Sequence, residues 1–347
     1  MEEHHVCHDR DRPAQVDPHS CRGRPDEHQI GRLTLTADRH QTDRLLAWAE
    51  PLDVERVWAI ESAAGLGRLL AQQLIAAGEH VVDVPPTLTA RVRLLGSSKA
   101  SKNDPNDAFA TAIAGLRHCG LRTVTRDGHT AILRLLADRH HDLSALRTQS
   151  ACRLHVMLRE LSAGGAPIRI SAAHGTEFLD RIEVGNDPVA IERKRLAHEH
   201  LADIRRVDAD LDAVKARIRE AVATSGTALT ELHGVGPVIA AIVLGHVHDI
   251  SRFRTRAQFA SYNGTAPIEA SSANRQRHRL NPRGNRQLNH AIHIIAVTQV
   301  GHDTPGRAYY LRRQAEGKTR KEALRALKRR ISDAVWRQLQ IDARLKH

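Results

Sequence analysis

The sequence contains little of what marks secreted, membrane-spanning or zinc-knuckle proteins. Only four cysteines occur in 347 residues, and no two of them are separated by two positions. That spacing excludes a zinc knuckle and a small disulfide-stapled scaffold. No run approaches the roughly 20 apolar residues that span a bilayer, and the N-terminus lacks a basic segment followed by an apolar core. We therefore expect a cytoplasmic protein with no membrane partner.

Histidine is abundant, with 23 residues, but its pattern lacks the partners of a metal site. His246 and His248 alternate as they would in a strand, and His290 and His293 share one face of a helix. Neither pair has a cysteine or carboxylate at the spacing of a zinc finger or a zinc protease. We expect these histidines to be ordinary surface or core residues.

The charge balance favours a polyanionic partner. The chain has 52 basic and 40 acidic residues, a net charge of +12, and arginine accounts for 44 of the basic residues. The planar guanidinium group pairs two-fold with phosphate, so an arginine surplus suits nucleic acid. GC-rich coding also raises arginine over lysine without selection for binding. Charge alone therefore leaves DNA or RNA binding and a neutral explanation equally open.

The first half of the chain predicts an α/β domain. Hydrophobic residues make up 41% of the sequence and charged residues 27%, enough for about two domains. Residues 1–28 are polar without apolar periodicity, and we expect them to be poorly ordered or a degenerate start. The elements expected next are a strand at 30–36, a helix at 42–49, a strand at 56–61, a helix at 65–77 and a strand at 80–84. The last three form a βαβ unit, which predicts a parallel pair of strands with functional groups at their carboxyl ends, where Glu61 lies.

Long helices follow. After a polar loop at 96–103, a helix is expected from Pro105 to about Leu116. Apolar residues at helical spacing predict a helix over 130–161 and a second over 188–223, with a turn region at 164–185 between them. The second helix carries a seam at steps of three and four, typical of a coiled coil: Leu201, Ile204, Val207 (or Asp208), Leu211, Val214, Ile218 and Val222. A final helix is expected over 319–339, with one apolar stripe and a basic face.

Three acidic residues in the first half suggest a magnesium site. If Asp104 caps the helix that follows, Asp107 lies three residues on and points the same way. An acidic cap, a proline and a second acid also make a well-capped helix with no chemistry at all. Glu61, at a strand end of the same α/β unit, is able to meet the pair across the sheet. Such carboxylates hold two Mg²⁺ ions in RNase H-like sites and act on phosphodiesters.

Two segments of the last third are candidates for nucleic-acid binding. Gly234 and Gly236 form a glycine turn before an apolar helix, which resembles a helix-hairpin-helix element that binds phosphate, or is simply a tight turn. Ser271 and Ser272 precede a basic stretch that contains Arg275, Arg277, Arg279, Arg283 and Arg286. A serine hydroxyl beside clustered guanidinium groups is able to attack phosphorus, although serines in basic loops are usually only solvated.

At these residues the chain resembles the DEDD transposases of bacterial insertion sequences, the IS110 family, which is grouped with IS116 and IS902. The matching landmarks are Ala59–Ser62, Lys102–Ala108, Gly234–Pro237 and Asn263–Asn289, in order, and the resemblance extends from about Asp17. It implies a RuvC-like (RNase H-like) α/β domain at 29–125, a coiled-coil helical linker at 126–226 and a mostly helical C-terminal transposase domain at 227–347.

The resemblance also implies a function. Family members are recombinases that join two DNAs under the direction of a structured guide RNA and assemble as dimers or tetramers. By motif, Asp17, Glu61, Asp104 and Asp107 correspond to the ligands of Mg²⁺, with two ions expected from the resemblance, and Ser272 corresponds to the nucleophile, with Ser271 as the fallback. The chain departs from the family pattern after Asp17, where Cys21–His28 is too polar for the expected strand, and at Ala273, where glycine is usual.

Two other functions fit the same sequence. A catalytically inactive transposase remnant would keep the basic C-terminal domain and bind nucleic acid without cleaving it. A structure-selective nuclease that relies on carboxylates alone would need Glu61 and Asp104 but no serine.

Overall fold

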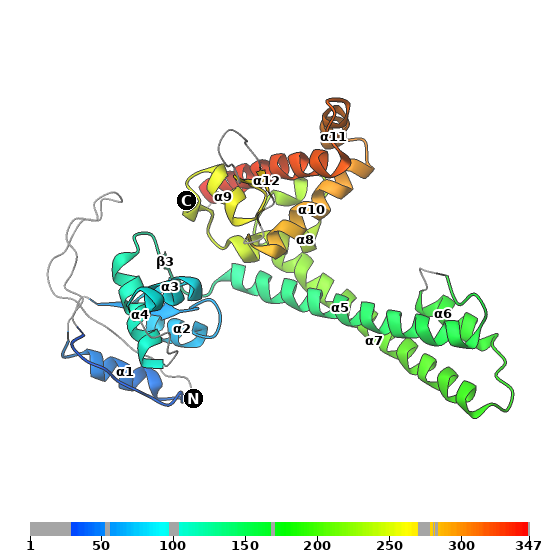
Figure 1. The fold of residues 1–347 in the computed structure, drawn as a ribbon, viewed down its shortest axis with the longest axis horizontal. Helices are drawn as coiled ribbons and strands as arrows, with labels where there is room; N and C mark the ends of the chain where they lie inside the picture. Colours follow the sequence, from blue (N-terminus) through cyan, green and yellow to red (C-terminus); the bar gives the residue numbers. More distant parts are fainter. Residues whose placement is uncertain are drawn as a thin grey trace. The chain divides into compact units, whose positions relative to one another are not determined.

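The computed structural model describes residues 29–52, 56–96, 104–167, 171–269, 278–279, 281 and 284–345. The chain divides into two compact units, Met1–Asp127 and Gly128–His347. It is mostly helical, with one small mixed sheet in the first unit and a two-stranded ribbon in the second (Figure 1). Within the described residues, no helix is long and apolar enough to cross a membrane.

The βαβ unit predicted from the sequence is present in the first unit. Strand β1 (Val57–Glu61) pairs in parallel with β2 (His80–Val84), and α2 (Arg68–Ala76) connects them. A short strand, β3 (Arg122–Thr123), pairs antiparallel with the other edge of β2. The described sheet therefore has the order β1-β2-β3, with β1 at one edge.

The two faces of this sheet have different coverings. Trp58 and Ile60 of β1 join a buried cluster with residues of α2 and of α1 (Gln41–Ala49). Side chains alternate along a strand, so Ala59 and Glu61 face the other way. On that face lies α4 (Asp104–Arg117), which contacts both β1 and β2.

The structure corrects three expectations for secondary structure. Residues 30–36 form no strand; they are irregular, although Leu33 and Leu35 pack on the buried cluster of α1 and α2. A helix not expected from the sequence, α3 (Pro86–Gly96), follows β2 directly and packs along α4. The turn region expected at 164–185 contains a further helix, α6 (Ala172–Asp180).

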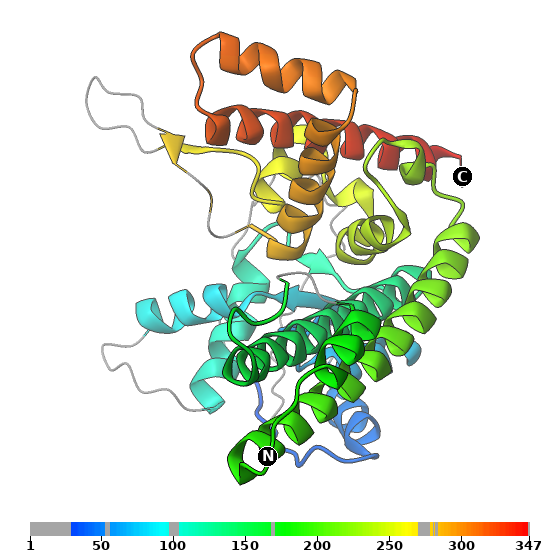
Figure 2. The same ribbon diagram turned by 90° about the vertical axis from the view of Figure 1, so that its right-hand side faces the viewer.

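The long helices of the second unit match the prediction closely. They are α5 (His129–Leu161) and α7 (Pro188–Thr224), which lie antiparallel and side by side, with α6 at their far end (Figures 1 and 2). The seven apolar residues of the predicted seam of α7 are buried, so Val207 and not Asp208 occupies the seam. They pack on the matching leucines of α5, including Leu133, Leu143 and Leu158.

A cluster of shorter helices packs on the near end of this pair. Its members are α8 (Pro237–Val247), α9 (Arg256–Tyr262), α10 (Arg286–Gly301), α11 (Pro305–Ala315) and α12 (Arg320–Arg344). The largest apolar core of the described chain joins α5, α7, α8, α10 and α12. In Figure 2, α11 runs along α12, which begins at Arg320, one residue after the Thr319 that opens the predicted helix. The division of this unit at residue 226 stays a prediction.

Candidate metal site and nucleic-acid interface

A tight loop follows the carboxyl end of β1, where Glu61 lies. Ser62 has φ of 53°, a left-handed conformation that costs energy in a residue other than glycine. Its carbonyl oxygen accepts hydrogen bonds from the N–H groups of Gly65 at 2.7 Å and Gly67 at 3.2 Å. A Cβ on Gly67 would lie 2.5 Å from Cγ2 of Ile60, so only glycine allows α2 to begin this close to the strand. The loop therefore fixes the backbone beside Glu61.

The strand register decides which carboxylates share a face of the sheet. Glu61 lies on the α4 face, as does Ala59, whose Cβ would come 2.8 Å from a Cβ placed on Gly115 of α4. Asp83 of β2 is directly opposite Ile60, so it lies on the other face, together with the core residues of β1. Asp83 pairs with Arg122 at 3.7 Å. Of these two strand-end acids, Glu61 is the one on the same face as α4.

Asp107 lies in the first turn of α4 and forms an ion pair with Arg93 of α3. Both side chains are 19% exposed. The two helices are also joined one turn further along, where the hydroxyl groups of Thr89 and Thr111 are 3.2 Å apart. Arg93 thus compensates the Asp107 charge, so a cation that binds this carboxylate has to displace or share it.

The predicted four-carboxylate set is only partly within the described residues. Asp17 and the side chain of Asp104 lie outside them, although residue 104 is placed as the first of α4. Among the described residues, no group of three His, Cys, Asp or Glu side chains is arranged to hold a metal ion. Glu61 and Asp107 are carboxylates, the oxygen ligands that Mg²⁺ prefers, so the donor chemistry fits this ion.

The glycine turn before α8 has a packing role. Gly234 has φ of 91°, and a Cβ there would lie 3.1 Å from the carbonyl oxygen of Ile295 in α10. Gln299, also in α10, donates a hydrogen bond of 2.8 Å to the carbonyl of His233. Gly236 is exposed and caps α8. Glycine is needed at position 234 because the turn before α8 approaches the backbone of α10 closely. Phosphate binding by this turn stays a prediction.

The segment with the two candidate serines is held at its base by two glycines. The strands β4 (Ile268–Glu269) and β5 (His278–Arg279) pair antiparallel. Below them, a Cβ on Gly284 would lie 2.5 Å from both Cα and N of Gly264, so the two backbones touch. Gly264 also has φ of 72°. At this contact of Gly264 with Gly284 there is no room for a larger residue.

A buried polar network supports this point. The Asn263 side chain donates to the Ser332 hydroxyl at 2.8 Å and accepts from the N–H of Thr265 at 3.1 Å and from its hydroxyl at 2.7 Å. Asn289 donates to the Asn263 carbonyl at 2.8 Å and accepts from Lys328 at 2.7 Å. Asn263 and Ser332 are fully buried. Burial lowers the pKa of Lys328. The network ties the ends of the serine segment to α10 and α12.

The remaining predicted residues are placed as follows. Ser271, Ser272, Arg275, Arg277 and Arg283 lie outside the described residues, and Arg279 is placed only as part of β5. Arg286 is exposed at the first position of α10.

A basic pair of helices was not singled out from the sequence as a binding surface. Residues 305–345, which form α11 and α12, contain twelve basic and four acidic residues. Three guanidinium groups surround the ring of Tyr309, those of Arg312 and Arg313 at 5.2 Å and that of Arg330 at 4.6 Å from its centroid. The net charge of +8 in this segment was visible in the sequence, while the convergence on Tyr309 needs the packing of α11 on α12.

Sequence reasoning also gave no role to Arg93 or Asn263. Their partners could not be identified from sequence, because Arg93 lies 14 positions from Asp107 and Asn263 lies 69 positions from Ser332. The strand-like alternation of His246 and His248 does not correspond to a strand, because His246 is in α8 and His248 caps its end. His290 and His293 do share α10, as expected.

Comparison with known proteins gives consistent matches over both units. Residues 226–311 match a family described as the transposase IS116/IS110/IS902 family, and residues 17–163 match the DEDD transposase domain of the IS110 type. The chain is 30% identical over 339 residues to a 44.8 kDa protein of insertion element IS116 from Streptomyces clavuligerus, covering 83% of each chain. It is 25% identical over 336 residues to a 42 kDa protein of IS900 from Mycobacterium paratuberculosis, covering 82% of this chain and 83% of the relative. A 43.6 kDa protein of IS110 from Streptomyces coelicolor is 42% identical over 106 residues, 30% of this chain and 26% of the relative.

Proposed function

Because the chain belongs to the IS116/IS110/IS902 family of insertion-element transposases, we propose that it cleaves and rejoins DNA strands at the ends of such an element, with Mg²⁺ and a serine nucleophile. The first unit is then the RuvC-like domain, and the α5–α7 pair is the coiled-coil linker. The observation that carries the metal part of the proposal is the placement of Glu61 on the sheet face covered by α4, the helix whose first turn contains Asp107.

Mg²⁺ in such a site polarises a phosphodiester and stabilises the charge that develops on its oxygens. The proposed ligands are Glu61, Asp104 and Asp107, with Asp17 as the fourth. The Arg93 guanidinium group balances the negative charge of the Asp107 carboxylate. The same ion pair also holds this carboxylate in place before the cation binds.

The serine part of the proposal assigns the attack to Ser272. Its hydroxyl oxygen forms a bond to phosphorus, the hydroxyl proton is lost, and the bond from phosphorus to the leaving sugar oxygen breaks as that oxygen is protonated. The touching backbones of Gly264 and Gly284 support this assignment, because they hold both ends of the segment that contains Ser272. Arg275, Arg277, Arg279 and Arg283, in or beside that segment, are the proposed phosphate ligands, with Arg286 on α10.

The proposed partners are the DNA ends, a target DNA and a structured guide RNA, bound by a dimer or tetramer. The net charge of +12, of which residues 305–345 contribute +8, supports binding to phosphate backbones. The guide RNA and the oligomeric state rest on family membership alone.

The test is covalent attachment to DNA. The full chain is incubated with a supercoiled plasmid that contains its own element, with the element's transcript and with either Mg²⁺ or a chelator. A protein–DNA adduct stable in detergent is expected with Mg²⁺ only, lost in Ser272→Ala and kept in Ser271→Ala. An adduct that survives in Ser272→Ala refutes the serine assignment, and cleavage without any adduct supports a nuclease that relies on carboxylates alone.

One observation favours the second candidate, an inactive nucleic-acid-binding remnant. Within the described residues, the outer edge of β1 has no partner strand, and the strand expected at 30–36 is absent. The family resemblance puts the first metal ligand on an opening strand. If the same plasmid is bound tightly with or without the chelator and is never cut, the remnant is the correct function.

A further inference from the structure

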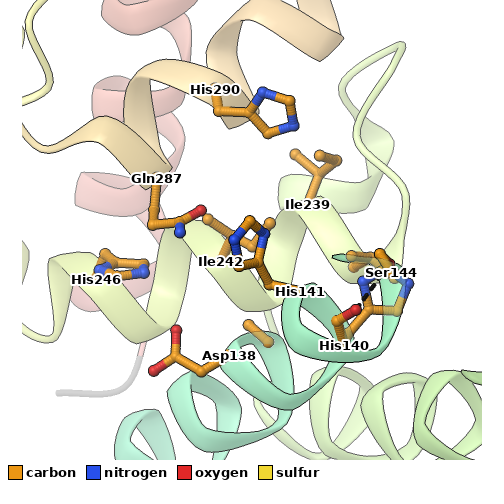
Figure 3. Close-up of a pocket in the computed structure, with 11 residues that line it drawn as sticks. Asp138, His140, His141, Ser144, Ile239, Ile242, His246, Gln287 and His290 are labelled. Carbon is orange, nitrogen blue, oxygen red and sulfur yellow. Dashed lines mark hydrogen bonds between the residues drawn. The ribbon is translucent and has the colours of Figure 1, made fainter. Parts of the chain in front are cut away.

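A cavity of about 220 Å³ lies within the second unit, between α5, α8 and α10. Figure 3 shows its wall: Asp138 and His141 come from α5, Ile239 and Ile242 from α8, and Gln287 and His290 from α10. Drug-sized ligands occupy pockets of roughly 300–1,000 Å³, so this one suits a smaller group. Its walls are helices, and α5 and α8 cross so closely that a Cβ on Gly245 would lie 2.7 Å from the backbone of Arg134. The cavity therefore lies beside a tightly packed crossing of α5 and α8, and the exposed His141 and His290 lie at its surface.

The lining combines flat rings, apolar groups and a few hydrogen-bonding side chains. Ile239 and Ile242 belong to the apolar part of the wall, and four imidazole rings contribute to it: His140, His141, His246 and His290. Asp138 and Gln287 supply a carboxylate and a carboxamide. His246 is held by the Asn285 carboxamide, 3.4 Å from its Nδ1 atom. This is the chemistry that binds a flat heterocycle by its faces and its polar edge.

The charges around the cavity do not favour an anion, and two of its histidines, His140 and His246, have a lowered pKa. Burial lowers the pKa of His246, and the nearby Arg134 lowers it further while Asp138 acts in the opposite direction. Burial likewise lowers the pKa of His140, with help from Lys215 and His141. Both rings are therefore neutral at pH 7. Among the described residues that line the cavity there is no lysine or arginine, and the nearby Arg134 guanidinium is paired with Asp138 at 3.7 Å, so no uncompensated positive charge faces the cavity.

The described histidines and Asp138 do not form a three-ligand metal site. Despite the four histidines and one aspartate, no three such side chains in the described part of the chain converge closely enough to hold one. A neutral, flat group with hydrogen-bonding edges remains.

We infer that this cavity accepts a single unpaired nucleobase, extruded from the DNA or RNA that the second unit binds. The inference rests on the proposed nucleic-acid partner. His141 and the two isoleucines contact the faces of the base, and Asp138 and Gln287 contact its polar edge. The cavity lies beside α8, which begins after the Gly234–Pro237 turn, and α10, which begins at the exposed Arg286. Both helix starts are predicted phosphate contacts, so a backbone that follows them passes the cavity.

The experiment uses the full chain and hairpins of either DNA or RNA that carry one bulged 2-aminopurine. Fully paired hairpins of the same length are the reference. Fluorescence anisotropy gives each affinity, and 2-aminopurine emission reports the environment of the bulged base. Stacking of one base on a protein ring typically contributes about 1–3 kcal/mol, which is about 5- to 150-fold in affinity. We expect the bulged hairpin of at least one of the two nucleic acids to bind about tenfold more tightly than its paired reference.

Variants then locate the base. His141→Ala removes a ring, Ile242→Trp fills the cavity, and Asp138→Asn changes an edge contact with almost no change in volume. Each is expected to reduce the preference for the bulge to about twofold or less while the affinity for the paired hairpin stays the same. His155→Ala, on the same helix but outside the cavity, is the matched control and keeps the preference. If Ile242→Trp melts early, the two smaller substitutions decide.

The outcomes distinguish a failure of the cavity inference from a failure of the proposed function. A preference with DNA only or with RNA only supports the cavity and identifies the source of the base. Equal binding of bulged and paired hairpins, or a preference that survives His141→Ala and Asp138→Asn, overturns the inference and leaves the proposed function intact. Failure to bind any hairpin contradicts the proposed nucleic-acid partner itself and the cavity with it.

Discussion

Replacing Asn263 should destabilise the residues that flank the serine segment while leaving the candidate serines themselves unchanged. Its side chain makes three hydrogen bonds in a fully buried position, one with Ser332 and two with Thr265. In Asn263→Ala the Ser332 hydroxyl, which is itself fully buried, loses this donor. Leaving a buried polar group without its partner costs about 1–3 kcal/mol, and the lost turn at Thr265 adds to it. We expect a total of about 2–4 kcal/mol.

This is a large share of the roughly 5–15 kcal/mol that stabilises a domain. For a unit of this size it lowers the melting temperature by roughly 5–15 °C, which calorimetry measures directly. The Asn263→Ala/Ser332→Ala double variant should lose less than the sum of the two single variants, because the second substitution removes the group that the first left unsatisfied. Additive losses, or a loss below about 0.5 kcal/mol for Asn263→Ala, would refute the network as the anchor of this segment.

Three further outcomes follow from other parts of the structure. Gly67→Ala should cost about 1–3 kcal/mol by overpacking against Ile60, read from urea unfolding of the full chain; an unchanged midpoint would contradict the close approach of α2. Because the pKa of His246 is lowered in the folded protein, the unfolded chain binds a proton at this residue at a higher pH than the folded chain does. The melting temperature should therefore fall as the pH drops below about 6.5, and His246→Gln should make that fall smaller. If the arginine cluster at Tyr309 contacts a phosphate, Arg330→Gln should make the slope of log K for DNA binding against log salt concentration shallower by about one. An unchanged slope would show that Arg330 contacts no phosphate.

The elements that sequence predicted well have strong periodicity over many residues. The helices over 130–161 and 188–223 differ from α5 and α7 by one residue at most at each end, because a repeated apolar seam over ten turns leaves little choice. The βαβ unit was also recognisable, since two compact apolar strands flank a helix closed by Gly78. Both predictions rest on local pattern and need no partner from elsewhere in the chain.

The elements that failed depend on something the local pattern does not contain. Residues 30–36 alternate as a strand does, but they pair with no described strand, and Leu33 and Leu35 pack instead on the buried cluster of α1 and α2. Pro85 and Pro86 follow the end of β2, and because proline is favoured at the first position of a helix, α3 begins at Pro86. His246 alternates with His248 only because the helix ends between them.

The candidate site was predictable in its types of residue and not in its contacts. Motif spacing singled out Glu61 and Asp107, and strand alternation then places Glu61 on the face of α4. The ion pair of Asp107 with Arg93 requires α3, which was not expected. The contact of Gly264 with Gly284 depends on long-range packing, which no local pattern predicts.

The central claim is that Glu61 and the acidic start of α4 bind a divalent cation, and titration calorimetry of the full chain with Mn²⁺ tests it without requiring activity. Glu61→Gln and Asp107→Asn should each weaken binding by at least tenfold, as loss of a direct ligand does. Asp83→Asn is the matched control, since its carboxylate stands at the neighbouring strand end but on the opposite face of the sheet. Binding that is unchanged in Glu61→Gln and Asp107→Asn, or is weakened equally in Asp83→Asn, would contradict the claim.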